Sequence, residues 1–295
     1  MSDVADRLEA EWSRHRPAVF GAAYRLLGSV AEAEDVVQDV WLRAAAADVS
    51  GVEDLRAWLV TIAARRSYDV LKSARVQRED YVGPWLPEPL VTGPDAAQQV
   101  LVDESVSTAM LLVMETLSPP ERVAFVLHDV FSFSFDEIAE VLDVSVPTAR
   151  KAASRARSRI ARARDSTPDA PRSERERLLL TFRGAYLNGD LAALIELLHP
   201  DVRYVTDGGG RVTAAQVPIL GGQRVAEVMV RVGQGRWRPD RMVLADIGGE
   251  PALVCVQDGQ VFSVDTLVID GGRIREYRRV MNPEKLGHLR AVTFG

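Results

Sequence analysis

The sequence predicts a multi-domain protein in which two all-α domains precede one α+β domain. The chain has 295 residues, which ordinary domain sizes divide into two or three domains. Helix-capping patterns recur through the first 165 residues, whereas strand patterns separated by glycine turns begin near residue 241. Proline-rich segments interrupt the helical patterns twice. We therefore expect domains at 1–80, 103–165 and 173–295, joined by linkers at 81–102 and 166–172.

The first domain is predicted to be a helical bundle. Ser29 and Glu32 have the spacing of a capping box, in which each side chain accepts a hydrogen bond from the other residue's amide. The helix that they begin runs to about Ala46 and carries an apolar stripe at helical spacing. A second helix starts near Asp54 and becomes basic toward residue 78. Simple solvation explains that basic face at least as well as DNA binding does.

The first linker is predicted to be extended and to pack against other residues. Its prolines remove backbone donors and favour a semi-rigid polyproline path. Trp85, Leu86 and Leu90 make it too apolar for a plain spacer. We therefore expect another part of the chain to cover this segment.

The second domain is predicted to contain a helix-turn-helix. Capping boxes begin at Ser118 and Ser134, and the first of these predicts a helix from Arg122 to His128. A tight turn falls at Asp143, after which a third helix runs to about residue 163. Two short helices joined by so tight a turn are typical of this motif.

Charge is concentrated in that third helix. The formal net charge of −6 by itself disfavours nucleic-acid binding. Lys and Arg minus Asp and Glu, however, give 12 − 25 = −13 for 1–145, 7 − 1 = +6 for 146–165 and 17 − 16 = +1 for 166–295. A cationic helix face of this kind fits the DNA major groove, although a solvated helix end is the alternative. The expected DNA contacts on this helix are Arg150, Lys151, Ser154 and Arg155.

The third domain is predicted to be α+β with an antiparallel sheet. Glycine-containing turns between the expected strands are hairpin signals. The predicted helices and strands are 175–187, 191–198 and 224–232, then 241–247, 251–257, 260–269 and 273–281. The lone Cys255 is expected to be buried in a strand. With one cysteine and no signal peptide or membrane span in the sequence, a cytoplasmic location is expected.

Three segments together resemble bacterial sigma factors of the extracytoplasmic-function group. They run from Ala33 to Ala44, from Arg56 to Arg66 and from Phe135 to Arg159. The resemblance implies that regions two and four of such a factor recognise the minus-ten and minus-thirty-five promoter elements. It further implies that core RNA polymerase is contacted by Asp35, Gln38 and Asp39, and promoter DNA by Arg65, Arg66 and Lys72. Asp143 departs from the glycine that the family usually has in the turn.

Three further segments resemble signatures of the subgroup that carries a C-terminal SnoaL-like extension. The residues concerned are Trp85, Leu86, Pro87, Glu88 and Pro89, then Asp207, Gly208, Gly209 and Gly210, and finally Asn282, Pro283, Glu284 and Lys285. The resemblance implies a cone-shaped α+β barrel that modulates activity in place of a separate anti-sigma factor. We also expect this domain to contact the linker and the region-two domain.

A sigma factor is the function that these patterns favour. One alternative is a one-component helix-turn-helix regulator with a ligand-sensing or enzymatic C-terminal domain. For an enzyme, the cone could be lined by Tyr204, Asp207, Trp237, Asp265, Tyr277 and Arg279. No spacing fixes an acid/base pair, and the four histidines lack metal-ligand spacing. We therefore expect no catalytic residue, metal or cofactor, while a small-molecule ligand of this domain stays open.

Overall fold

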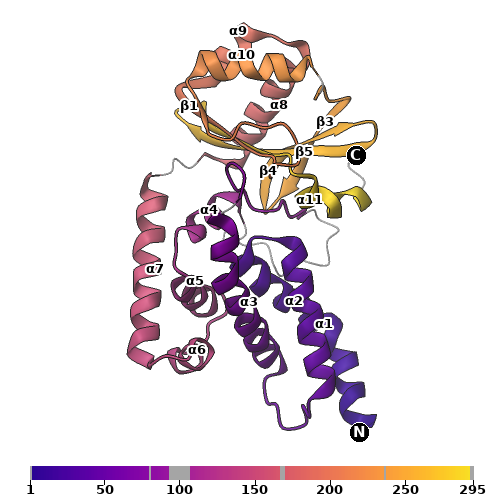
Figure 1. Ribbon diagram of the computed structural model, residues 1–295, viewed down its shortest axis with the longest axis vertical. Helices are drawn as coiled ribbons and strands as arrows, with labels where there is room; N and C mark the ends of the chain where they lie inside the picture. The colour runs from indigo at the N-terminus through magenta and orange to yellow at the C-terminus, as the bar shows by residue number, and fades with distance from the viewer. Residues whose placement is uncertain (1, 80, 93–106, 167–169, 236, 293–295) are drawn as a thin grey trace. The chain divides into compact units, whose positions relative to one another are not determined.

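The computed structural model describes residues 2–79, 81–92, 107–166, 170–235 and 237–292. The chain divides into two compact units, which Figure 1 traces in order along the chain. The first unit holds residues 1–79 and 94–163, and the second holds residues 80–93 and 164–295. The described part of the linker therefore belongs with the C-terminal domain, although a whole helical domain separates them in the sequence. No helix within the described residues is long and apolar enough to span a membrane.

Three long helices begin the first unit and pack on one another. They are α1 (Ser2–Leu27), α2 (Val30–Ala46) and α3 (Leu55–Glu79). The predicted cap begins α2, because Ser29 Oγ accepts a hydrogen bond from the Glu32 amide at 3.1 Å. Asp54 caps α3 in the same way through the Ala57 amide at 2.9 Å. The predicted apolar stripe of α2 is buried.

The second half of this unit contains the predicted helix-turn-helix. Its elements are α4 (Thr108–Glu115), α5 (Pro119–Phe125), the π-helical turn η3 (Val126–Val130), α6 (Phe135–Leu142) and α7 (Val146–Ser166). Both predicted capping boxes form, at Ser118 and Ser134. Asp143 ends α6 in the left-handed conformation, with φ 54° and ψ 54°. Aspartate tolerates this conformation better than most residues, so the turn forms without the usual glycine.

The helix predicted from Arg122 to His128 is interrupted. It changes from α to π geometry at Val126, and Ser132 then adopts a positive φ of 60°. This irregular segment places the Phe131 ring against the guanidinium groups of Arg25 and Arg56, 5.9 and 5.7 Å from the ring centroid. Cation–π contacts of this kind connect the two halves of the first unit.

Arg122 makes the second connection between the two halves. Its side chain is 3% exposed and donates from Nη1 to the Leu26 carbonyl at 2.6 Å and from Nε to the Met114 carbonyl at 3.0 Å. It also forms an ion pair with Glu115. Leu26 lies in the last turn of α1, where carbonyls lack helical partners. The buried cation therefore satisfies the end of one helix while it fixes another.

Within the described residues, the second unit is a six-stranded sheet with α8 (Arg172–Asn188), α9 (Leu191–Leu197) and α10 (Gly222–Gly233) on one face (Figure 1). The strands are β1 (Leu198–Asp207), β2 (Ile219–Leu220), β3 (Arg241–Ile247), β4 (Glu250–Gln257), β5 (Gln260–Asp270) and β6 (Arg273–Val280), in the order β2-β1-β6-β5-β4-β3. The short elements α11 (Pro283–Leu286) and η4 (Gly287–Ala291) follow. The four hairpin strands β3 to β6 were predicted, and the sheet confirms them.

The prediction of an antiparallel sheet is wrong for one pair of strands. β1 runs parallel to β6, with Asp207 opposite Val280. The sequence patterns missed β1 because it follows α9 directly, without a turn, and includes Pro200 near its start. Parallel strands end at the same edge of a sheet, so the segments that follow β1 and β6 leave the sheet side by side.

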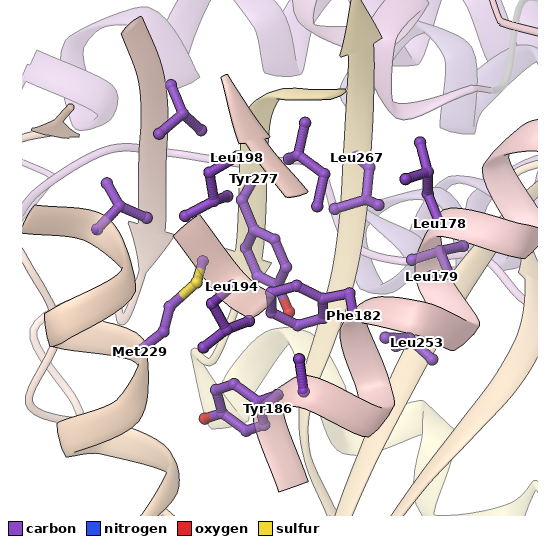
Figure 2. Close-up of a cluster of buried hydrophobic side chains, with 14 of the residues drawn as sticks. Leu178, Leu179, Phe182, Tyr186, Leu194, Leu198, Met229, Leu253, Leu267 and Tyr277 are labelled. Atoms are coloured by element: carbon purple, nitrogen blue, oxygen red, sulfur yellow. The ribbon is translucent and has the colours of Figure 1, made fainter. Parts of the chain in front are cut away.

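The core of the second unit lies between the helices and the sheet. Figure 2 shows Phe182 and Tyr186 from α8 and Met229 from α10 packed against strand residues that include Leu253 and Tyr277. Cys255 is fully buried in this core, as predicted, and burial raises the pKa of its thiol.

Two glycines give a paired test of this packing. A Cβ at Gly233 would lie 2.8 Å from Cζ of the buried Tyr186 ring, whereas a Cβ at the exposed Gly184 of α8 would meet nothing within 4 Å. Gly233→Ala should lower the free energy of unfolding by about 1–3 kcal/mol. Gly184→Ala should raise it by about 0.5–1 kcal/mol, because alanine favours a helix over glycine. Urea unfolding of both variants measures this, and equal shifts would contradict the packing described.

Candidate functional sites

The predicted DNA-contacting face of α7 is exposed. Arg150, Lys151 and Ser154 face solvent, while the small apolar residues on the opposite side of the helix are buried against its partners. The Arg150 guanidinium also lies 5.2 Å from the centroid of the Phe135 ring, at the start of α6. The face therefore offers cations in the arrangement that the sequence predicted.

Arg155 differs from its neighbours because a buried carboxylate holds it. Its Nε donates to Glu121 Oε1 at 2.8 Å, and Arg159 Nη1 donates to Glu121 Oε2 at 2.7 Å. Burial alone raises the pKa of Glu121, but hydrogen bonds from Ser118 and the two arginines outweigh it and lower that pKa. Arg155 thus ties α7 to α5 while half of its side chain stays exposed. Sequence reasoning identified Glu121 only as a helix cap.

The predicted polymerase-contacting face of α2 is also exposed. Asp35 and Gln38 face solvent, and Leu42, one helical turn further on, is 59% exposed. Positions i, i+3 and i+7 lie on one side of a helix. Acidic and apolar groups are therefore presented together along this face.

Asp39 connects the two predicted contact surfaces of the region-two domain. Arg66 Nε of α3 donates to Asp39 Oδ2 of α2 at 2.7 Å, with the two side chains 42% and 40% exposed. The structure thus brings a predicted polymerase contact and a predicted DNA contact into one ion pair. Of the other predicted contacts on α3, Arg65 is exposed, and Lys72 pairs with Asp69 at 3.1 Å.

In the second unit, the linker and the two C-terminal motifs converge on Asp207. This fully buried carboxylate accepts hydrogen bonds from the Tyr81 hydroxyl at 2.5 Å, the Leu86 amide at 2.8 Å and Lys285 Nζ at 2.7 Å. Asn282 Nδ2 donates to the Tyr81 hydroxyl at 3.0 Å. Burial, and then the bond to Asp207, raises the pKa of Tyr81. We call Tyr81, Leu86, Asp207, Asn282 and Lys285 the Asp207 cluster.

Lys285 holds the linker in a second way. Its Nζ donates to the Leu86 carbonyl at 2.6 Å, so both backbone groups of Leu86 are bound. The same ammonium lies 4.3 Å from the centroid of the Trp85 ring and 4.9 Å from that of Tyr81. The aromatic residue singled out in the linker therefore covers a buried cation.

The rest of the described linker follows the edge of the sheet. The Pro89 carbonyl lies 2.7 Å from His288 Nε2. Beyond it, the Leu90 carbonyl accepts from the Gly248 amide at 2.7 Å, and the Thr92 amide donates to the Asp246 carbonyl at 2.9 Å. A β-bridge between Val91 and Ile247 joins the linker to β3, the last strand of the sheet.

The glycines after Asp207 allow this close approach. Gly209 and Gly210 both have positive φ, at 57° and 70°. A Cβ on Gly209 would lie 2.2 Å from Asn282 Nδ2, and one on Gly210 would lie 3.2 Å from the Val82 side chain. Both the turn and the space therefore require glycine.

The other residues of the three motifs mostly form turns, buried packing, a helix start or a surface ion pair. Gly208 would clash with Ala214 if it carried a Cβ, at 2.7 Å. Pro87 lies within the bound stretch and Glu88 is buried at 7% exposure. Pro283 begins α11, and Glu284 pairs with Arg211 at the surface at 2.7 Å.

A separate polar group lies inside the C-terminal core. Asp265 accepts two hydrogen bonds from Arg279, at 2.9 and 2.7 Å, and one from the Tyr277 hydroxyl at 2.6 Å. Arg279 also donates to the Tyr186 hydroxyl at 3.1 Å. Both charged side chains are at most 1% exposed. A carboxylate so fully bound is poorly placed to accept a proton from a substrate.

The residues considered for an enzymatic cone do not form one group. Tyr204 is buried beside Tyr277, and its pKa is raised by burial. Asp207 instead faces the linker, and Trp237 stacks on Phe262, 5.7 Å between ring centroids.

Comparisons with known proteins find matches that cover both units of the chain. Residues 12–76 match the family model for Sigma-70 region 2, and residues 107–160 match that for Sigma-70, region 4. The chain is 35% identical over 288 residues to "ECF RNA polymerase sigma factor SigJ" of Mycobacterium tuberculosis, which covers 94% of this chain and 92% of that protein. It is 32% identical to "Probable ECF RNA polymerase sigma factor SigI" of the same species, with 98% of each chain covered. The crystal structure of M. tuberculosis SigJ superposes with a TM-score of 0.74, at 34% identity, covering 94% of this chain and 98% of that one.

The Asp207 cluster can be tested by removing its central charge. Asp207→Asn leaves the Lys285 ammonium buried without an anion, so the free energy of unfolding should fall by about 3–5 kcal/mol. Amide hydrogen exchange in residues 81–92 should accelerate, because the linker loses its anchor. Glu284→Gln is the matched control: it removes a carboxylate that pairs only at the surface and should change stability by less than about 1 kcal/mol. Unchanged exchange in Asp207→Asn would contradict the role of the cluster.

Proposed function

The chain belongs to the extracytoplasmic-function RNA polymerase sigma factors, and from this premise we propose which of its surfaces bind polymerase and which contact promoter DNA. Asp35, Gln38 and Asp39 bind core RNA polymerase. The basic residues of α3 contact the minus-ten element, and the cationic face of α7 contacts the minus-thirty-five element. The observation that carries this proposal is the exposure of acidic and cationic faces on different helices of one unit.

The polymerase-binding part of the proposal rests on the face of α2. Its acidic groups would repel DNA, so a protein partner fits this face better than DNA does. Leu42 adds an exposed apolar group to the same face, and protein interfaces commonly combine an apolar centre with a polar rim.

The DNA-binding part rests on the geometry of α6 and α7. In a helix-turn-helix the second helix enters the major groove, with its N-terminal residues near base edges. Arg150 and Lys151 lie in the first turns of α7 and are exposed. Arg155 is already bound to Glu121, so we assign it to orienting α7 and to contacting phosphate rather than a base.

We propose that the C-terminal domain modulates activity by holding the linker, in place of a separate anti-sigma factor. The support is that residues 81–92, part of the segment between α3 and α4, are bound along its sheet and by the Asp207 cluster. Binding a segment of a tether shortens the part that remains free, which changes how far apart the two domains can reach. The proposal includes a contact of this domain with the region-two domain and a non-catalytic role for it.

A second candidate function is a one-component regulator that needs DNA and a ligand but no polymerase. The helix-turn-helix with its exposed cationic α7 is the feature that this candidate shares with the sigma factor. Promoter-specific transcription by core polymerase separates the two candidates. Initiation by the full chain supports the sigma factor, whereas tight operator binding with no initiation supports the regulator.

The polymerase contact predicts a loss of affinity in a double variant. Asp35→Ala with Gln38→Ala should weaken binding to core polymerase about tenfold, equivalent to about 1.4 kcal/mol, because two central contacts are lost. Fluorescence anisotropy of the labelled chain titrated with core polymerase measures this. Glu140→Ala, which removes an exposed acid from α6, serves as the control. An unchanged dissociation constant in the double variant would refute this docking surface.

The proposed DNA contact predicts a loss of transcription initiation that depends on promoter sequence. With promoters selected from a randomised library, Arg150→Ala should reduce initiation about 5- to 150-fold, since one base contact contributes about 1–3 kcal/mol. The reduction should shrink when the minus-thirty-five element is scrambled. Arg162→Ala removes an exposed arginine near the end of the same helix and should cost much less. Equal losses for the two variants would argue against base contact by Arg150.

A further inference from the structure

The ion pair between Asp39 and Arg66 joins two surfaces that the proposed function assigns to different partners. Asp39 lies on α2 with the polymerase contacts, and Arg66 lies on α3 with the minus-ten contacts. The 2.7 Å bond uses Arg66 Nε and Asp39 Oδ2, and about two fifths of each side chain is exposed. Either partner can therefore approach the pair from solvent.

Asp39 and Arg66 each weaken the binding of the other to an outside partner. A guanidinium that already faces a carboxylate gains less from a phosphate, because its charge is compensated and its Nε is in use. Asp39 likewise gains less from a cation on polymerase while Arg66 is bound to it. Exposed ion pairs are weak, so a binding partner can displace one member.

The neighbouring residues have the same charges without this pairing. Arg65 precedes Arg66 on α3 and is exposed, and Asp35 lies one turn before Asp39 on α2 and is also exposed. Among the residues that the structure describes, neither forms an ion pair with the other helix. They are therefore matched controls that change charge on the same helices while leaving the pair intact.

We propose that binding of core polymerase to Asp39 releases Arg66 for the promoter, by exchange of ion-pair partners. The inference rests on the proposed function, because it assumes both contacts. Each binding event then favours the other by the same factor, as linkage requires. The factor is bounded by the strength of the pair, about 1.4- to 5-fold, which corresponds to about 0.2–1 kcal/mol.

The test compares four single variants of the full chain: Arg66→Gln, Arg65→Gln, Asp39→Asn and Asp35→Asn. Affinity for core polymerase is measured without DNA, and affinity for a single-stranded minus-ten oligonucleotide is measured without polymerase, at low salt. Arg66→Gln should bind core polymerase 1.4- to 5-fold more tightly than Arg65→Gln, because Asp39 is set free. Asp39→Asn should bind the oligonucleotide more tightly than Asp35→Asn by a similar factor, because Arg66 is set free.

The outcomes separate this inference from the proposed function. If Arg66→Gln and Arg65→Gln bind core polymerase equally, while Asp35→Asn weakens that binding and Arg65→Gln weakens oligonucleotide binding, the exchange is overturned and the contacts stand. If Asp39→Asn leaves core binding intact and Arg66→Gln leaves oligonucleotide binding intact, the proposed contacts of these two residues fail, and the exchange fails with them. Circular dichroism checks that all four exposed-site variants keep their helices.

Discussion

The buried carboxylate of Asp207 is the group on which the organisation of the second unit depends. A charge taken out of water is costly unless it is paired and hydrogen-bonded. Two of its three donors, the Tyr81 hydroxyl and the Leu86 amide, come from the linker, and the third, the Lys285 ammonium, comes from the C-terminal end of the fold. Without the linker, the pair of charges would be left partly unsatisfied. The linker is therefore part of this domain in the physical sense, although a helical domain lies between them in the sequence.

Parallel pairing of β1 and β6 explains how the two C-terminal motifs meet. Both strands end at one edge, so the glycine turn after Asp207 and the segment from Asn282 to Lys285 leave the sheet as neighbours. The Met281 and Asn282 amides donate to the Asp207 carbonyl at 2.7 and 2.9 Å, which fixes their register. An entirely antiparallel sheet, as the hairpin signals predicted, gives no reason for these motifs to converge. Local patterns predict hairpins well, but a parallel pair depends on contacts between residues far apart in the chain.

Sequence patterns predicted which side of a helix is buried better than they predicted which charged side chains pair with each other. Caps at Ser29 and Ser134, the left-handed turn at Asp143 and the buried side of α7 all follow from local rules, and they agree with the structure. The bonds of Arg155 to Glu121 and of Arg66 to Asp39 do not follow from such rules, because the partners lie 34 and 27 positions apart. Some of the acidic side chains of the chain therefore form ion pairs with its own arginines. A count of charges cannot reveal which cations remain available to DNA.

The placement of the Asp207 cluster also gives the protein an order of assembly during translation. The linker up to Thr92 emerges long before Lys285, since 285 − 92 = 193 residues are still to be added. At typical synthesis rates this takes roughly 10 to 40 s. During that interval the helices of the first unit, the last of which ends at Ser166, are completed, while Trp85 and Leu86 have no domain to bind. The nascent chain therefore passes through a stage in which its DNA-binding helices exist and the linker is still free on the ribosome.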